Sequence, residues 1–323
     1  MRWVLRIAAG LSLALVAVFL FGPREPLVVN VGFDAARFES GVDAYFDKVE
    51  ADIPNLRPAA RKRVVWAGGK GERTPLSVVY LHGFSASAEE IRPVPDRVAE
   101  ALGANLIYTR FKGHGRDGDA MAEARVRDWM ADTAEALAAG RAVGEEVLVI
   151  ATSTGASIAT AALVQPDMAR AVKGGVFVSP NFGVKNAMAP LLTWPLARYW
   201  LPLLAGERRS FEPLNAKQAA HWTTEYPSVS VLPMAAIVKH AAGLDHSEVT
   251  VPALFYFSDQ DGVVEAEHTA RVARQWGGVV TRGRPDLRAG DDPLAHVIAG
   301  RIMSPGNTDA AVMSMLDWVA TLR

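Results

Sequence analysis

Hydrophobic positions follow two alternating patterns along most of the chain. Short runs rich in aliphatic and β-branched residues predict strands at Arg63–Trp66, Leu76–Leu81, Asn105–Phe111, Glu146–Ala151, Gly174–Val178, Ala253–Phe257 and Gly277–Thr281. Apolar positions at helical spacing predict helices at Gly41–Ile53, Glu89–Leu102, Ala122–Val143, Ser153–Leu163, Glu265–Trp276 and Asp309–Leu322. Strands that alternate with helices indicate an α/β fold, in which a mostly parallel sheet carries helices on both faces.

The alternation is broken by a long gap between Asn181 and Val251. Its prolines stand among large apolar residues, as in Ala189–Leu196 and Tyr199–Pro202. A segment this apolar is not expected to stay in water as a linker. The sequence therefore predicts an inserted helical cap at 181–250, between a first core part at 24–180 and a second at 251–323.

Residues 1–23 form a hydrophobic N-terminal segment. Arg2 and Arg6 precede an uncharged stretch of 15 residues, Ile7–Phe21, and no small-x-small cleavage site follows it. We expect an uncleaved signal anchor that attaches the protein to a membrane and leaves the catalytic domain exported, because the basic residues precede the stretch. The alternatives are a cleaved signal peptide on a secreted protein and an apolar N-terminal helix on a cytoplasmic one.

Composition narrows the function classes. The 323 residues contain 34 Lys and Arg against 35 Asp and Glu, so the formal net charge of −1 argues against nucleic-acid binding. There is no cysteine, which excludes disulfides, thiol nucleophiles and Cys-based zinc sites. No His-Glu-x-x-His motif or comparable cluster indicates a metal, and no cofactor is expected.

Three turns carry residues suited to catalysis. The strand ending near Ala151 enters a helix through Ser153 and Gly155, although such a serine could also be a simple helix N-cap. Another strand ends in His82-Gly83, followed by an aromatic residue. Asp261 follows the strand Ala253–Phe257, and His296 lies 35 residues later in a loop that contains a proline. Asp259 competes with Asp261, but it is better explained as a turn-forming residue.

These motifs, in this order, resemble the α/β-hydrolase family. Ala151-x-Ser153-x-Gly155 is similar to its Gly-x-Ser-x-Gly nucleophile elbow, with alanine in the first position. The resemblance implies an α/β-hydrolase fold and a catalytic triad of Ser153, Asp261 and His296. It also implies an oxyanion hole made by the backbone N–H groups of Phe84 and Thr154, with His82 in a structural role.

Within that family, the Gly113-His114-Gly115 turn, the cap and the serine resemble the lysophospholipase, monoacylglycerol-lipase and carboxylesterase branch. His114 is then structural. The resemblance implies a serine esterase that cleaves carboxylic esters through an acyl-enzyme, and the apolar cap favours small-molecule or lipid esters. A thioesterase, an aminopeptidase and a catalytically silent binding scaffold remain alternatives. An aminopeptidase needs an acid to hold the substrate amine, for which Glu225 is the cap candidate. No function follows from the neighbouring cluster Trp222–Pro227.

Overall fold

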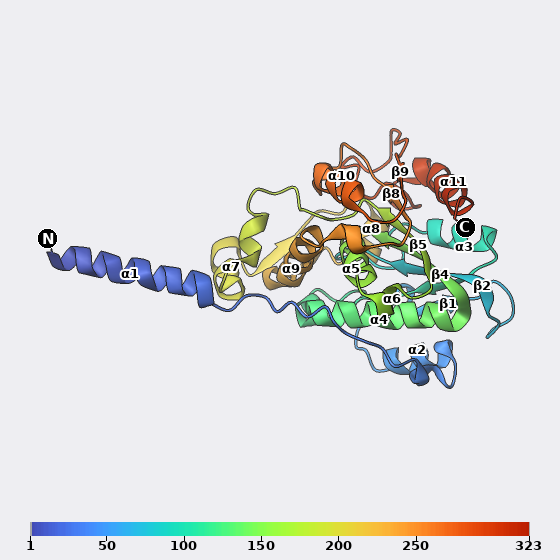
Figure 1. The fold of residues 1–323 in the computed structure, drawn as a ribbon, viewed down its shortest axis with the longest axis horizontal. Helices are drawn as coiled ribbons and strands as arrows, with labels where there is room; N and C mark the ends of the chain where they lie inside the picture. The colour runs from blue at the N-terminus through green and yellow to red at the C-terminus, as the bar shows by residue number, and fades with distance from the viewer. Residues whose placement is uncertain (1, 323) are drawn as a thin grey trace.

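A seven-stranded sheet runs through the centre of the computed structural model, which describes residues 2–322 (Figure 1). Its spatial order is β1-β3-β2-β4-β5-β8-β9. Only β1 runs antiparallel to its neighbour, so the predicted, mostly parallel sheet is confirmed. The strands are β1 (Arg63–Val65), β2 (Thr74–Leu81), β3 (Asn105–Tyr108), β4 (Gly144–Thr152), β5 (Val172–Val178), β8 (Ala253–Tyr256) and β9 (Val280–Gly283).

Side chains alternate between two cores, one on each face of the sheet. Val79, Val149 and Phe177 point to one face, whereas their neighbours Tyr80 and Ile150 point to the other. All of them are buried, as expected for a parallel sheet covered on both sides. This is why the strands read as nearly continuous apolar runs in the sequence.

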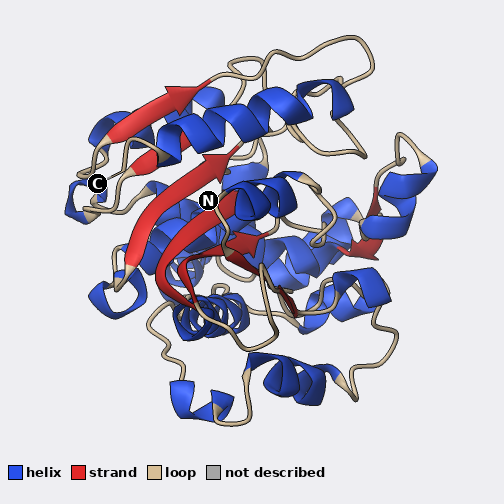
Figure 2. Ribbon diagram, turned by 90° about the vertical axis from the view of Figure 1, so that its right-hand side faces the viewer, coloured by secondary structure: helices blue, strands red, loops and turns tan. Residues whose placement is uncertain are grey.

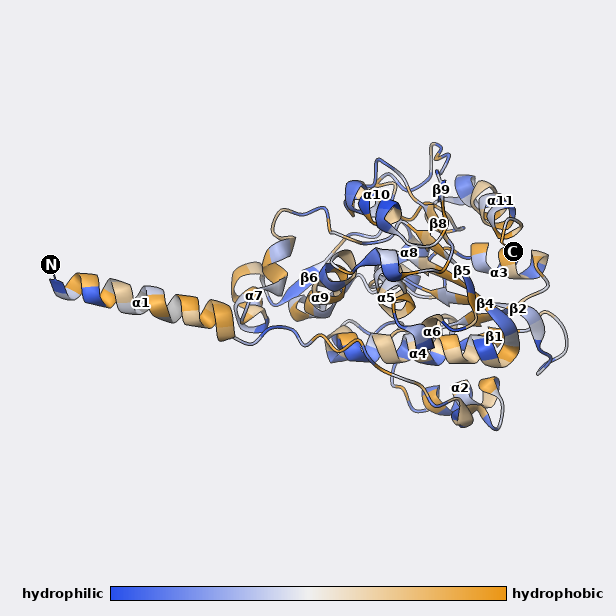
Figure 3. Cartoon of the chain, in the orientation of Figure 1, coloured by the Kyte–Doolittle hydropathy of each residue, from blue (hydrophilic) through white to orange (hydrophobic). Residues whose placement is uncertain are grey.

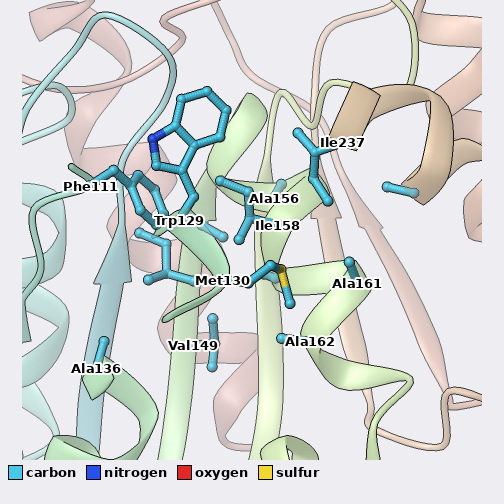
Figure 4. Close-up of a cluster of buried hydrophobic side chains, with 14 of the residues drawn as sticks. Phe111, Trp129, Met130, Ala136, Val149, Ala156, Ile158, Ala161, Ala162 and Ile237 are labelled. Atoms are coloured by element: carbon cyan, nitrogen blue, oxygen red, sulfur yellow. The ribbon is translucent and has the colours of Figure 1, made fainter. Parts of the chain in front are cut away.

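Helices cover both faces, as the views in Figures 1 and 2 show. On one side, Trp129, Ile158, Ile237 and Val149 belong to one cluster of buried apolar side chains, part of which Figure 4 shows. The helices of this side are α2 (Val42–Glu50), α4 (Val126–Val143), α5 (Thr154–Leu163), α6 (Pro166–Ala169), α9 (Val231–Ala242) and α10 (Ala266–Gln275). The other core is covered by α3 (Val94–Ala101) and α11 (Thr308–Val319).

Residues 181–250 contain more than a helical cap. They form α7 (Ala197–Ala205), α8 (Ala216–His221), α9 and a small antiparallel sheet of β6 (Arg208–Ser210) and β7 (Glu225–Pro227). Each of these two strands is three residues long, which is too short for an alternation of apolar and polar residues to show in the sequence. Helix α9 packs on α5, so part of this segment belongs to the layer that covers the sheet.

Several predicted bounds differ from the structure. The helix predicted from Glu89 begins only at Val94, because Pro93 and Pro95 favour a helix start and not a helix interior. The strand predicted to Phe111 ends at Tyr108, and the helix predicted from Ala122 begins at Val126 after a short 3₁₀ turn. The strand predicted at Gly277–Thr281 begins only at Val280 and ends at Gly283 (β9). Gly277 and Gly278 lie before it, in close contact with the backbone of residues 247–251.

The N-terminal segment forms helix α1 (Arg2–Phe21), which extends away from the sheet (Figure 1) and is largely apolar in Figure 3. Its C-terminal end contacts the segment 181–250, where Phe19 lies edge-on to Trp194 at 5.6 Å between ring centroids. The amide of Leu196 donates to the carbonyl of Pro23 at 2.7 Å. Across residues 2–322, no helix combines the length and apolar character needed to cross a membrane.

Candidate active site

Ser153 occupies a strained turn between β4 and α5. Its backbone has φ 51° and ψ −120°, a region that residues other than glycine seldom adopt. Backbone hydrogen bonds hold it there, because its N–H donates to Val178 at 3.0 Å and its carbonyl accepts from Asn181 at 3.1 Å. At Gly155, a Cβ would lie 2.5 Å from the carbonyl oxygens of Leu81 and His82 at the end of β2, so only glycine fits.

The structure brings the three predicted triad residues together. His296 Nε2 lies 3.0 Å from Ser153 Oγ, and His296 Nδ1 lies 2.8 Å from Asp261 Oδ2. An ionised carboxylate only accepts hydrogen bonds, so Nδ1 carries the imidazole proton. That leaves the lone pair of Nε2 facing the serine hydroxyl, which is the arrangement a general base needs. All three side chains are buried.

Asp261 is fixed by the loop that follows β8. Its Oδ1 accepts from the amides of Val263 at 2.8 Å and Val264 at 2.9 Å, which leaves Oδ2 for the histidine. Asp259 lies outside this arrangement, because its exposed carboxylate pairs with Arg282. Asp261, and not Asp259, therefore lies within hydrogen-bond distance of His296.

Asp292 is a site residue that the sequence interpretation missed. Its Oδ2 accepts from the backbone amides of His296 and Val297 at 3.1 and 2.8 Å, and its Oδ1 accepts from Leu294 at 3.0 Å. Its own amide donates to Ser304 Oγ at 3.0 Å. The side chain thus holds the loop that carries His296. The available signal was Asp-Pro, a pair that initiates turns.

The candidate oxyanion donors flank the serine from two loops. Phe84 follows Gly83 at the end of β2, and Thr154 is the first residue of α5. Within residues 2–322, neither amide donates to a protein acceptor. Gly83 brings its loop close to the nucleophile, because a Cβ on it would lie 3.2 Å from Ser153 Cβ. Both donors can therefore serve a negative oxygen that develops beside Ser153.

His82 and His114 lie beneath this loop and not in the triad. The His82 ring bridges two backbone groups, with Nδ1 2.8 Å from the carbonyl of Gly83 and Nε2 accepting from Phe111 at 3.2 Å. Burial lowers the pKa of His82 to about 4. His114 packs on His82 at 5.0 Å between ring centroids, and burial holds its pKa well below the usual value. Both rings are therefore neutral parts of the scaffold.

The cluster Trp222–Pro227 lies against the oxyanion loop. The amide of Thr223 donates to the carbonyl of Ser85 at 2.7 Å, and the ring of Tyr226 stands edge-on to Phe84 at 5.4 Å. Ser85 has φ 62°, so this bond holds a strained residue. Glu225 pairs with Arg208 at 2.5 Å, and its side chain is mostly exposed. It is therefore not placed to hold a substrate amine.

The charges around the site favour the protonated form of His296. Burial alone would lower the pKa of His296, but the hydrogen bond and charge of Asp261, with the charges of Glu90 and Asp292, raise it above its ordinary value. Among the described residues, His, Asp and Glu side chains form no group of three placed to hold a metal ion. The chemistry available here is acid–base and nucleophilic catalysis by side chains.

Comparison with known proteins finds similarity to a lipase. A thermostable monoacylglycerol lipase of Bacillus sp. (strain H-257) is 27% identical over 196 residues, which are 60% of this chain and 73% of that protein.

Solved structures share the fold. One described with the metagenome-derived lipolytic enzymes LipS and LipT has a TM-score of 0.66 at 16% identity, over 82% of this chain and 99% of its own. A soluble variant of the Saccharomyces cerevisiae monoglyceride lipase has a TM-score of 0.59 at 10% identity, over 80% and 90% of the two chains. Residues 73–281 match the model of the family described as serine aminopeptidase, S33. The chain belongs to this family and has the α/β-hydrolase fold.

Proposed function

We propose that this protein is a serine hydrolase that cleaves carboxylic esters, with lipid-like esters such as monoacylglycerols as its substrate class. The observation that carries the proposal is the buried, hydrogen-bonded series from Ser153 through His296 to Asp261. The similarity to the Bacillus monoacylglycerol lipase supports the substrate class.

The mechanism follows from the positions of the protons. Ser153 Oγ attacks the ester carbonyl while His296 Nε2 takes its proton, and Asp261 stabilises the imidazolium that forms. The amides of Phe84 and Thr154 stabilise the tetrahedral oxyanion. His296 then gives the proton to the leaving alcohol, and water attacks the acyl-enzyme by the same steps to release the acid.

An apolar acyl chain suits the buried apolar side chains that the segment 181–250 contributes. Trp222, Tyr226 and Met234 are buried side chains of the segment 181–250, and Tyr226 contacts the oxyanion loop directly. Pockets for small ligands are mostly lined by such side chains. An amine-binding aminopeptidase is less well supported, because the carboxylate of Glu225 is mostly exposed and already paired with Arg208.

We further propose that α1 attaches the protein to a membrane and that the catalytic domain is exported. Trp3, Leu13 and Phe21 of α1 expose their apolar side chains. On α7, next to the end of α1, Leu203 and Leu204 are likewise exposed. Apolar surface of this extent favours a lipid environment. Fractionation of cells, followed by protease treatment of intact spheroplasts, tests both parts. Recovery in the soluble cytoplasmic fraction would overturn them.

The hydrolase proposal is tested with the full-length protein in detergent. A fluorophosphonate probe should label the wild type, whereas Ser153→Ala and His296→Ala should remain unlabelled. Monoacylglycerols, p-nitrophenyl esters of increasing chain length, an acyl thioester and amino-acid p-nitroanilides are then compared as substrates. Preference for medium or long acyl esters is expected. Absence of labelling in folded protein would refute the hydrolase, and preference for the anilides would identify an aminopeptidase.

A further inference from the structure

Glu90 is a buried carboxyl group directly behind the oxyanion loop. It lies in the irregular segment before α3 and is only 3% exposed. Its Oε2 accepts from the amide of Gly83 at 2.7 Å and from the hydroxyl of Tyr80 at 3.1 Å. The same hydroxyl lies 3.2 Å from Thr152 Oγ1. Glu90 is therefore linked to the residue before Phe84 and, through Tyr80, to the residue before Ser153.

The carboxyl also lies close to the nucleophile. A Cβ placed on Gly83 would meet Glu90 Oε1 at 2.6 Å and Ser153 Cβ at 3.2 Å, so both groups approach the same point of the loop. A side chain at this position would displace one of them. Because Gly83 has no side chain, both Glu90 and Ser153 can approach this point of the loop closely.

The charged and titratable groups around Glu90 come from three segments. Tyr80 faces it from β2, and His296 interacts with its charge from the loop before α11. The adjacent Glu89 is engaged elsewhere, because it pairs with Arg92 at 2.6 Å and with Arg301. In the described part of the chain, no lysine or arginine pairs with Glu90. A charge on Glu90 therefore has no cationic side chain to neutralise it in this part of the structure, and it contributes to raising the pKa of His296.

We propose that Glu90 is a positioning residue of this hydrolase, which fixes the oxyanion loop through the Gly83 amide and places a negative charge close to Ser153 and the histidine that serves it. This inference rests on the triad proposed above. It assigns one side chain two separable effects, because the hydrogen bonds need only an acceptor, whereas the action on His296 needs the charge.

The two effects predict a pH signature. Burial raises the pKa of Glu90 to about 7, so its charge develops near neutral pH, and that charge is one of the causes that raise the pKa of His296. Ester hydrolysis needs neutral His296, so activity rises with pH as this residue loses its proton. Removing the Glu90 charge lowers the pKa of His296, and the acidic limb of the pH profile should move to lower pH.

Two substitutions separate the effects. Glu90→Gln keeps an acceptor for Gly83 and Tyr80 but removes the charge. Its kcat on the alkaline plateau should stay within about threefold of the wild type, while the acidic limb of kcat/KM moves down by at least about half a pH unit. Glu90→Ala leaves the Gly83 amide without its acceptor, so kcat should fall by about 10- to 100-fold, less than the loss of a whole oxyanion donor.

Glu89→Gln is the matched control, because it removes a neighbouring buried carboxylate that points to arginines. Its acidic limb should coincide with that of the wild type. Thermal melting shows whether each variant is folded. If Glu90→Ala does not fold, the pH profile of Glu90→Gln still tests the proposal. The proposal is overturned if the limbs of Glu90→Gln and Glu89→Gln coincide, or if folded Glu90→Ala keeps the wild-type kcat. Ester turnover by the wild type, measured against Ser153→Ala as the blank, tests the proposed hydrolase activity independently of Glu90.

Discussion

Replacing Asp261 with asparagine tests the candidate triad most directly, because the structure fixes how the amide must lie. In the wild type, Oδ1 accepts from the amides of Val263 and Val264, while Oδ2 accepts from His296 Nδ1. Asparagine has one oxygen and one NH₂ group for these two positions. The oxygen can serve the two loop amides or the histidine, but not both.

The orientation that serves the loop should dominate. Turning the NH₂ group toward Val263 and Val264 would set donors against donors, at about 1–3 kcal/mol for each buried group left unpaired. With the oxygen kept on the loop, the NH₂ group faces His296 and makes Nδ1 the acceptor. The imidazole proton then moves to Nε2, 3.0 Å from Ser153 Oγ, where a lone pair is needed.

We therefore expect Asp261→Asn to lower kcat by about 10³- to 10⁴-fold, or about 4–5.5 kcal/mol of transition-state stabilisation, with the fold intact. The assay is hydrolysis of p-nitrophenyl butyrate on the alkaline plateau, together with the rate of fluorophosphonate labelling. Asp259→Asn is the matched control, since the same change two residues away affects an exposed carboxylate paired with Arg282. A kcat within tenfold of the wild type for Asp261→Asn would refute the tautomer argument.

Three further predictions concern the scaffold around the site. Gly155→Ala should abolish probe labelling or lower the melting temperature sharply, because its Cβ would lie 2.5 Å from the carbonyl oxygens of Leu81 and His82. The free energy of unfolding should fall as the pH drops from about 6.5 toward 4, because His82 binds a proton in the unfolded chain but not in the buried site; over that whole range the loss is about 3 kcal/mol. The difference in melting temperature between about pH 7.5 and about pH 5 should therefore be smaller in His82→Gln than in the wild type. Thr223→Pro removes the amide that holds Ser85 and should lower kcat about tenfold, whereas Thr223→Ala keeps the amide, loses only an unpaired buried hydroxyl and should match the wild type in the ester assay.

The parts of the site that the sequence predicted are those with local signals. Ser153 stands at a strand-to-helix turn with small residues two positions away on each side, and the clash at Gly155 shows why that pattern is needed. Asp261 was favoured over Asp259 because its place after a strand and before Val263-Val264 resembles the acid loop of the family, and in the structure the amides of these two valines bind its carboxylate. Such contacts span two or three residues and leave a readable pattern.

The parts that the sequence did not reveal depend on contacts between distant segments or on weak periodicity. Thr223 meets Ser85 across more than a hundred residues, and no pattern around Trp222–Pro227 announces that contact. Glu90 fell within a predicted helix, because its apolar neighbours have helical spacing up to Leu102. Prolines 93 and 95 instead start the helix at Val94, and the freed segment turns Glu90 toward Gly83.

The order of the strands explains why these residues meet. β3 lies on one side of β2 and β4 lies on the other side, so the direction in which successive strands are added to the sheet reverses between β2 and β4. Ligands of open parallel sheets bind at the carboxyl ends of strands beside such a point. In register, Leu81 lies opposite Ala151, which sets the loop of Phe84 beside the turn of Ser153.

Asp261 lies farther away, because it follows β8 and β5 intervenes between β8 and β4. Two strand spacings amount to about 10 Å, too far for a direct bond between the serine and the acid. The imidazole of His296 bridges that gap with one nitrogen on each side. Its loop must therefore reach back over the strand ends, and Asp292 holds it there through three backbone amides. Asp292→Ala should accordingly weaken catalysis by loosening His296, even though its side chain touches no reacting atom.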